Sequence, residues 1–260
     1  MRRLPALALA LGAALGACQT TPYTHRHQLD LVPEGEEMKL GLTSYQQALS
    51  SAKLSTDAQA TAMVRRVGER LAKAADKPDY KWEFNLIDDP KTVNAWCLPG
   101  GKVAVYSGIL PVTRDENGLA VVLGHEISHA LARHGGERMS QGMLAQFGGA
   151  ALSVAMSNEP AATQALATQA YGAGAQVGVL LPFSRKQESE ADHIGLILMA
   201  KAGYDPANAV PFWERMAALN KGGGSGLSRY LATHPPDQQR IADIKKELPE
   251  AEGYYKKAEK

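Results

Sequence analysis

Hydrophobic and polar positions alternate only in a central stretch of this chain, and elsewhere they favour helices. The stretch between residues 80 and 107 predicts strands at 80–87 and 102–107, with an extended segment at 93–98 and turns at 88–90 and 99–101. The remaining pattern predicts helices at 34–53, 57–75, 187–201, 206–219 and 237–248. We therefore predict a mainly helical α+β domain with a small β-sheet.

A further predicted helix, residues 115–133, carries the most informative motif. Its apolar residues recur at helical spacing, Thr113 and Glu116 have the spacing of a capping box, and two glycines follow it. Within it lies His125-Glu126-Ile127-Ser128-His129. Positions four apart share a helix face, so both imidazoles can bind one metal ion. The motif predicts a zinc peptidase in which His125 and His129 are ligands and Glu126 is the general base.

The motif supplies two ligands, so a third must come from another part of the chain. In metzincins a third histidine lies six residues after the second, but here that position is Gly135, and His134 is one residue off. A later predicted helix carries two carboxylates on one face, Glu188 and Asp192. One of them can bind the metal while the other orients a ligand histidine.

Several motifs together resemble a known family. They are His125 to His129, the run Ser184-Arg-Lys-Gln-Glu-Ser-Glu-Ala-Asp192, Asn94-Ala-Trp with Pro99-Gly-Gly upstream, and Thr233-His-Pro downstream. The chain resembles the zinc metallopeptidase family of HtpX, the CAAX prenyl endopeptidase and the mitochondrial Oma peptidase, especially its bacterial periplasmic lipoprotein members. The resemblance covers residues 34–248. It implies a gluzincin-like domain in which the edge strand of the sheet borders the active-site helix.

This resemblance also implies roles for particular residues. It implies one Zn²⁺ per chain, with Glu188 as the third ligand and Asp192 behind a ligand histidine. His234 would lie near the metal as an oxyanion donor; binding the metal in a resting state and capping the last helix are its alternatives. Strand 102–107 would be the edge strand that holds extended substrate, at Val103 and Val105. Asn94 would bind a substrate amide or carbonyl, or serve only as a turn residue.

The first residues indicate targeting. Two arginines precede an apolar stretch at 4–15, and small residues lead to Cys18. The run Leu15-Gly-Ala-Cys18 resembles a bacterial lipobox, which implies lipidation of Cys18; a plain secretory signal and an uncut anchor are the alternatives. Gln19, in place of aspartate, implies the outer membrane. We expect a signal peptide at 1–17, a lipidated tether at 18–33, a peptidase domain at 34–250 and a tail at 251–260.

The segment 141–187 lies between the two ligand-bearing helices in the sequence. It is rich in glycine and alanine, and Glu159 is its one charged residue as far as position 181. The Asn158-Glu159-Pro160 break predicts two helices. Scattered glycines argue against a membrane span, so we expect a lid or a membrane-surface contact.

Composition narrows the choice of function. The chain has 260 residues and a net charge of +1, which argues against nucleic-acid partners. Cys97 is expected to be a small buried residue. We expect a zinc metalloendopeptidase that cleaves unfolded or misassembled envelope proteins, lipid-anchored on the periplasmic side of the outer membrane, with outer-membrane assembly machinery as a partner. The alternative is a lipoprotein chaperone or assembly factor with a latent metal site.

Overall fold

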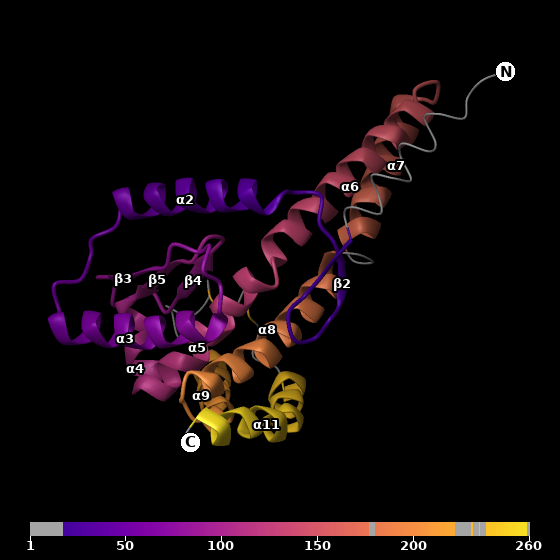
Figure 1. Ribbon diagram of the computed structural model, residues 1–260. Coiled ribbons are helices and arrows are strands. Elements are labelled where there is room, and N and C mark those ends of the chain that lie inside the picture. The colour runs from indigo at the N-terminus through magenta and orange to yellow at the C-terminus, as the bar shows by residue number, and fades with distance from the viewer. Residues whose placement is uncertain (1–17, 177–179, 222–229, 231–233, 235–237, 259–260) are drawn as a thin grey trace. The chain divides into compact units, whose positions relative to one another are not determined.

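The computed structural model describes residues 18–176, 180–221, 230, 234 and 238–258 (Figure 1). The predicted signal peptide at 1–17 lies outside these residues, as do Thr233 and Pro235. The chain divides into two compact units. Unit 1 comprises residues 1–34 and 133–187, and unit 2 comprises residues 35–132 and 188–260.

Unit 2 contains a three-stranded sheet formed by β3 (Glu83–Ile87), β4 (Ala95–Leu98) and β5 (Lys102–Tyr106). The strand order is β3-β5-β4; β5 is parallel to β3 and antiparallel to β4. The turn between β4 and β5 contains Gly100 and Gly101 at φ values of 83° and 80°. Residues other than glycine rarely adopt this left-handed backbone conformation, which explains why two glycines occupy the turn.

The prediction that 102–107 forms the edge strand is wrong. β5 is the central strand, and Val103 and Val105 are fully buried in it. Their peptide groups lie between two neighbouring strands, so they cannot hold a substrate strand. On the outer side of β3, the Ser55 N–H donates to the Leu86 carbonyl (2.8 Å). In this three-stranded sheet, a neighbouring segment thus pairs with the end of β3, whereas the outer edge of β4 has no strand partner among the described residues.

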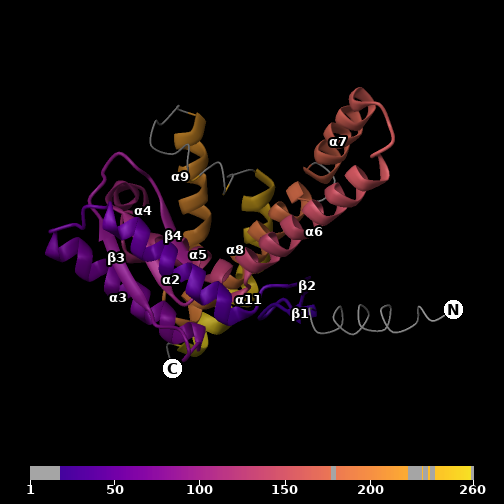
Figure 2. The ribbon, with the colours of Figure 1, turned by 90° about the horizontal axis from the view of Figure 1, so that it is seen from above.

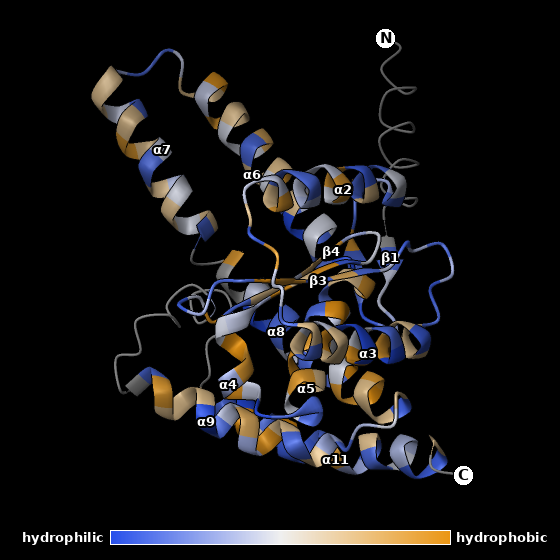
Figure 3. Ribbon diagram, turned by 90° about the vertical axis from the view of Figure 1, so that its left-hand side faces the viewer, coloured by the Kyte–Doolittle hydropathy of each residue, from blue (hydrophilic) through white to orange (hydrophobic). Residues whose placement is uncertain are grey.

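Helices cover both faces of this sheet. In Figures 1 and 3, α2 (Glu34–Ser50) lies over one face, while α3 (Ala58–Ala75) and α5 (Glu116–Leu131) lie under the other. The Asp57 side chain caps α3 by accepting from two backbone N–H groups. In α5 every residue from Gly118 to Leu131 is buried. This helix is thus part of the hydrophobic core and also carries the metal motif.

The start of α5 differs from the predicted capping box. The Asp115 carboxylate accepts from the Gly118 N–H (2.9 Å), whereas Thr113 ends the short helix α4 (Leu110–Thr113), which follows η1 (Ser107–Ile109). Asp115 is therefore the N-cap. After α5, Arg133 adopts a left-handed conformation (φ 55°), and the next helix begins directly after it.

The last helices of unit 2 bring distant parts of the sequence to α5. They are α8 (Leu181–Lys201, with residues 188–201 in this unit), η3 (Pro206–Asn208), α9 (Ala209–Lys221) and α11 (Gln238–Ala258). α8 crosses α5 where Gly195 meets Gly124. A Cβ added to Gly195 would lie 3.0 Å from the His125 backbone nitrogen. Because neither glycine has a side chain, the two helix backbones approach closely.

Unit 1 contains a two-stranded sheet and a pair of long helices. β1 (Cys18–Thr20) pairs with β2 (His27–Leu29), and α6 (His134–Ala155) runs beside α7 (Ala161–Ala175) (Figures 1 and 2). This confirms the predicted break at residues 158–160. Among the described helices, none combines the length and apolarity that a membrane crossing requires. The lid role of 141–187 stays a prediction.

The glycine contact between α5 and α8 can be tested by adding a side chain. Gly195→Leu places a branched side chain against the backbone of α5. We expect the free energy of unfolding to fall by about 1–3 kcal/mol, the usual effect of overpacking. We also expect at least about tenfold weaker zinc binding, because the third ligand is on α8. Chemical denaturation and zinc titration measure the two effects.

Gly253→Ala is the matched control. Gly253 is an exposed glycine in α11, and an added Cβ would meet no atom within 4 Å. Its replacement should leave zinc binding unchanged and stabilise the helix by roughly 0.5–1 kcal/mol. Equal zinc affinity in both variants would show that the crossing does not position the site.

Candidate metal centre

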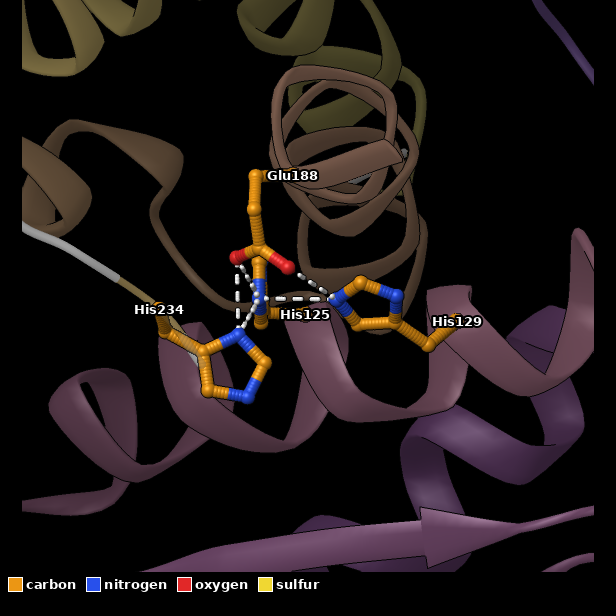
Figure 4. Close-up of side chains that lie close together, drawn as sticks. All are labelled: His125, His129, Glu188 and His234. Carbon is orange, nitrogen blue, oxygen red and sulfur yellow. Dashed lines mark hydrogen bonds and ion pairs between the residues drawn. The ribbon is translucent and has the colours of Figure 1, made fainter. Parts of the chain in front are cut away.

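The two histidines of the motif lie one turn apart on α5 and point to the same place (Figure 4). Their Nε2 atoms are 3.1 Å apart, and both side chains are buried. The helix therefore presents two imidazole nitrogens side by side, as the sequence predicts.

Glu188 and His234 complete a group of four ligand-type atoms that lie within 4.8 Å of one another. The Glu188 carboxylate oxygens are 3.3 Å from His125 Nε2 and 3.3 Å from His129 Nε2. His234 Nδ1 is 2.7 Å from Glu188 Oε2 and 3.1 Å from His125 Nε2. Ligand atoms bound tetrahedrally to zinc are about 3.3 Å apart, from bond lengths of about 2.0–2.1 Å. The four side chains fit a zinc ion in spacing and chemistry.

The charges around these residues point to the same conclusion. Glu126, Glu188 and Asp192 are all buried, and Arg240 is the one buried cation among their described neighbours. When all three carboxylates are ionised, they exceed the one guanidinium by two negative charges, and uncompensated buried charge is strongly unfavourable. A divalent cation supplies the two balancing positive charges.

The pKa values of His125 and Glu188 in the metal-free chain also show that the site favours positive charge. Burial and Arg240 lower the pKa of His125, but hydrogen bonds to Asp192 and Glu188 outweigh them and raise this pKa to about 9. Burial raises the pKa of Glu188, but hydrogen bonds from three histidines hold it far below its usual range. Glu188 and Asp192 therefore stay ionised, and His125 gains a proton when no metal is bound.

Asp192 orients His125 from behind. Its Oδ1 lies 2.9 Å from His125 Nδ1. A hydrogen bond donated by Nδ1 fixes the tautomer and leaves Nε2 available to a metal, which is the usual arrangement around a histidine ligand. This is the position that the resemblance implies for Asp192.

Arg240 is the site residue that the sequence analysis did not identify. Its Nε and Nη2 donate to the two oxygens of Asp192 at 2.6 and 2.7 Å, and its guanidinium lies 3.4 Å from the centre of the Trp213 ring. The sequence could have indicated Arg240 only through its position, because it lies on the same face of α11 as the buried residues Ile244 and Ala251. A charged residue in a buried stripe indicates a buried partner.

Glu126 lies beside the group with its carboxylate buried. Burial raises the pKa of Glu126, while His234 and His125 partly offset this effect. Its Oε1 is 3.6 Å from His234 Nε2. The same carboxylate lies near Cys97 on β4: burial, and then the charge of Glu126, raise the pKa of the Cys97 thiol far above its usual value. The open edge of the sheet thus borders the predicted general base.

His134 and Asn94, which the sequence analysis also discussed, lie outside the four-residue group. His134 is buried in α6, in unit 1, outside the four-residue group. Asn94 stands directly before β4, half-buried, and its backbone carbonyl accepts from the Tyr106 N–H (3.0 Å). Substrate binding by its side chain stays a prediction.

Comparison with known proteins identifies relatives that share this motif-bearing region. A model of peptidase family M48 matches residues 58–248. The mitochondrial metalloendopeptidase OMA1 of Schizosaccharomyces pombe is 38% identical over 234 residues, which cover 89% of this chain and 66% of that protein. OMA1 of Saccharomyces cerevisiae is 36% identical over 190 residues, 69% of this chain and 50% of that protein.

A bacterial protein is also similar. The β-barrel assembly-enhancing protease of Escherichia coli is 30% identical over 218 residues, which cover 81% of this chain and 43% of that protein. The chain thus spans between 43% and 66% of the length of these relatives.

The comparisons contradict the predicted location. The fungal, plant and human relatives are named as mitochondrial enzymes, whereas we predicted a lipid-anchored protein on the periplasmic side of a bacterial outer membrane. That prediction depended on the short run ending at Cys18 and on Gln19. A few residues near the N-terminus are weaker evidence of location than similarity over most of the chain.

The role of Arg240 can be tested by replacing it with alanine. Arg240→Ala leaves the Asp192 carboxylate buried without its cation, which we expect to lower the free energy of unfolding by about 3–5 kcal/mol. Zinc affinity should fall about 10–100-fold, because Asp192 would no longer hold His125 in place. Calorimetry and competition with a chelator measure the two quantities.

Lys245→Ala is the control on the same helix. Lys245 is exposed, and its ion pair with Glu214 lies at the surface. Surface pairs contribute little, so stability and zinc affinity should stay near those of the parent. A similar loss of zinc affinity in both variants would remove Arg240 from the site.

Proposed function

The chain belongs to peptidase family M48, a family of zinc metallopeptidases, and we propose that it is a zinc-dependent endopeptidase acting on unfolded or misassembled polypeptides. One observation carries the proposal. A buried carboxylate, Glu126, lies beside a three-histidine, one-carboxylate group that fits zinc. A protein that only binds partners has no need of this base.

The chemistry divides between the metal and the chain. Bound zinc supplies a Lewis acid that makes water acidic near neutral pH. Glu126 would take a proton from the attacking water and pass it to the leaving amine. Its raised pKa suits both steps, because a carboxyl group with an ordinary pKa releases protons readily but rarely returns them at neutral pH. His125, His129 and Glu188 would hold the metal, while Asp192, itself bound by Arg240, orients His125.

His234 gives the site a resting state. A catalytic zinc needs one position for water, whereas four protein ligands are typical of closed structural sites. The Nδ1 of His234 is among the four ligand-type atoms, and its Nε2 faces Glu126. We propose that His234 occupies the water position at rest and moves away before catalysis. Oxyanion stabilisation, its predicted role, would follow only after that movement.

The open edge of β4 is the proposed substrate site, in place of Val103 and Val105. The Tyr106 N–H donates to the Asn94 carbonyl, and bonded pairs alternate along an antiparallel ladder. The peptide groups of Trp96 and Leu98 therefore face β5, and those of Ala95 and Cys97 face the open edge. An extended substrate would bind these groups as an added strand. Recognition through the main chain favours unfolded polypeptides of varied sequence.

Lipid attachment at Cys18 is a separate proposal. Its support is the run of small residues before this cysteine. Mass spectrometry of the N-terminal peptide tests it: an unmodified Cys18 in the mature chain would end the proposal.

The endopeptidase proposal is tested with Glu126→Gln. We expect this variant to keep one zinc per chain and to lose nearly all cleavage of an unfolded protein such as casein, because the amide cannot accept the proton. Electrophoresis and metal analysis measure the two properties.

The controls are a chelator and Glu214→Gln, which changes an exposed glutamate on α9. Glu214→Gln should cleave like the parent, and the chelator should stop cleavage. If the parent binds zinc and cleaves nothing, or if Glu126→Gln cleaves equally well, the chaperone alternative replaces the enzyme.

The resting role of His234 is tested with His234→Ala. Three ligands remain, so zinc content should stay near one per chain while basal cleavage increases several-fold. The comparison uses initial rates on the same unfolded substrate. A lower rate with unchanged zinc would assign His234 to oxyanion stabilisation instead.

Substrate binding at β4 is tested by removing one outward N–H. Cys97→Pro lacks this donor, and proline is tolerated on edge strands. We expect KM to rise about threefold to tenfold, the usual effect of one hydrogen bond, with zinc content unchanged. Cys97→Ala keeps the N–H and should retain the parent KM; a matching rise in KM would place the effect in the side chain.

A further inference from the structure

Unit 1 contains a cavity that has no part in the proposed peptidase chemistry. Its volume is about 360 Å³, within the usual range for ligand sites. It lies within this unit between β2, α6 and α7. Its apolar wall is formed by Leu29, Leu144, Ala145, Tyr171, Ala175 and Leu180. In Figure 3, much of α6 and α7 is pale or orange, with hydrophilic residues at intervals between.

The polar end of the cavity is already neutralised from within the unit. Of the described residues that line it, Glu137 carries a full charge. Its two oxygens accept from Arg26 at 2.6 and 2.8 Å, and one of them also accepts from the Gln187 amide at 2.6 Å. Burial alone would raise the pKa of Glu137, but the hydrogen bonds from Arg26 and Gln187 outweigh burial and lower this pKa. The carboxylate therefore stays ionised. An ionic ligand would compete with these bonds, and an apolar ligand leaves them intact.

An exposed apolar stripe continues from the cavity along α6. Leu144 lines the cavity and is 48% exposed; Phe147 and Val154 follow at helical spacing and are 69% and 75% exposed. Glu159 is the one charged residue between Met139 and Ser184. An apolar chain longer than the cavity would therefore meet further apolar surface along this helix.

The backbone of Cys18 lies next to the wall of this cavity. In the β1–β2 pairing, Cys18 is the register partner of Leu29, which lines the cavity. The residue whose sequence context resembles a lipid-attachment site is thus paired with a residue that lines an apolar cavity. The sequence pattern and the strand register are independent observations.

From these four observations we propose that the cavity binds a long aliphatic chain, such as the acyl chain of a lipid. A water molecule occupies about 30 Å³ in the liquid, so the volume holds roughly a dozen methylene-sized groups. A polypeptide would bring a peptide group at every residue, and apart from Glu137 and Tyr171 the polar side chains described in the lining of the cavity are those of His27, Gln28 and Gln141. The acyl chain comes either from free lipid or from a lipid attached to Cys18.

The first experiment measures binding of radiolabelled palmitate by equilibrium dialysis to the full chain carrying Cys18→Ser. We expect about one palmitate per chain. Adding Ala145→Trp or Ala175→Trp, on opposite walls, should weaken binding at least about tenfold by filling the cavity. Adding Ala165→Trp, at an exposed position of α7 outside the cavity, should not. Circular dichroism of each variant, beside the parent, reports whether the helices of unit 1 are folded.

The source of the chain follows from comparing Cys18→Ser with the parent from a host that attaches lipid. Lower palmitate uptake by the parent means that its own acyl chain fills the cavity, and equal uptake means that free lipid does. Absence of binding to Cys18→Ser overturns the proposal, as does undiminished binding in both filled variants. Dimers that the filled variants abolish, without palmitate binding, would assign the cavity to a second copy of the chain.

Discussion

The close crossing of α5 and α8 is the constraint on which the metal site depends. At Gly124 and Gly195 neither helix has a side chain, so the two backbones approach until an added Cβ would touch main-chain atoms. This contact joins a helix with two histidine ligands to a helix with two carboxylates. Glu188 and Asp192 then reach opposite sides of the same imidazole, His125.

Because the site is buried, its negative charges must be neutralised by nearby cations. Three carboxylates at one buried place repel one another unless cations neutralise them. Arg240 provides one positive charge from α11, where it also stacks on Trp213. A divalent ion provides the rest, so metal binding and folding of unit 2 are coupled. The same acidic surroundings hold His125 in the tautomer that a metal needs.

Local patterns predicted most of the fold and the centre of the site. Most helices and strands lie near their predicted positions, although α11 continues to Ala258 through the predicted tail. His125, His129, Glu188 and Asp192 come together as the motifs and the resemblance imply. The errors concern non-local contacts. The resemblance implied that β5 is the edge strand, and strand alternation alone does not show which strand lies at the edge. Arg240 belongs to no motif, and only its partner on α8 explains its burial.

The measurement that tests this account most directly is X-ray absorption spectroscopy of the zinc-loaded resting chain, beside His234→Ala. The account predicts one zinc per chain with three histidine nitrogens and a carboxylate in the parent. One imidazole should be replaced by a water oxygen in the variant. A parent spectrum with two imidazoles and a water, unchanged by His234→Ala, would contradict the closed resting site.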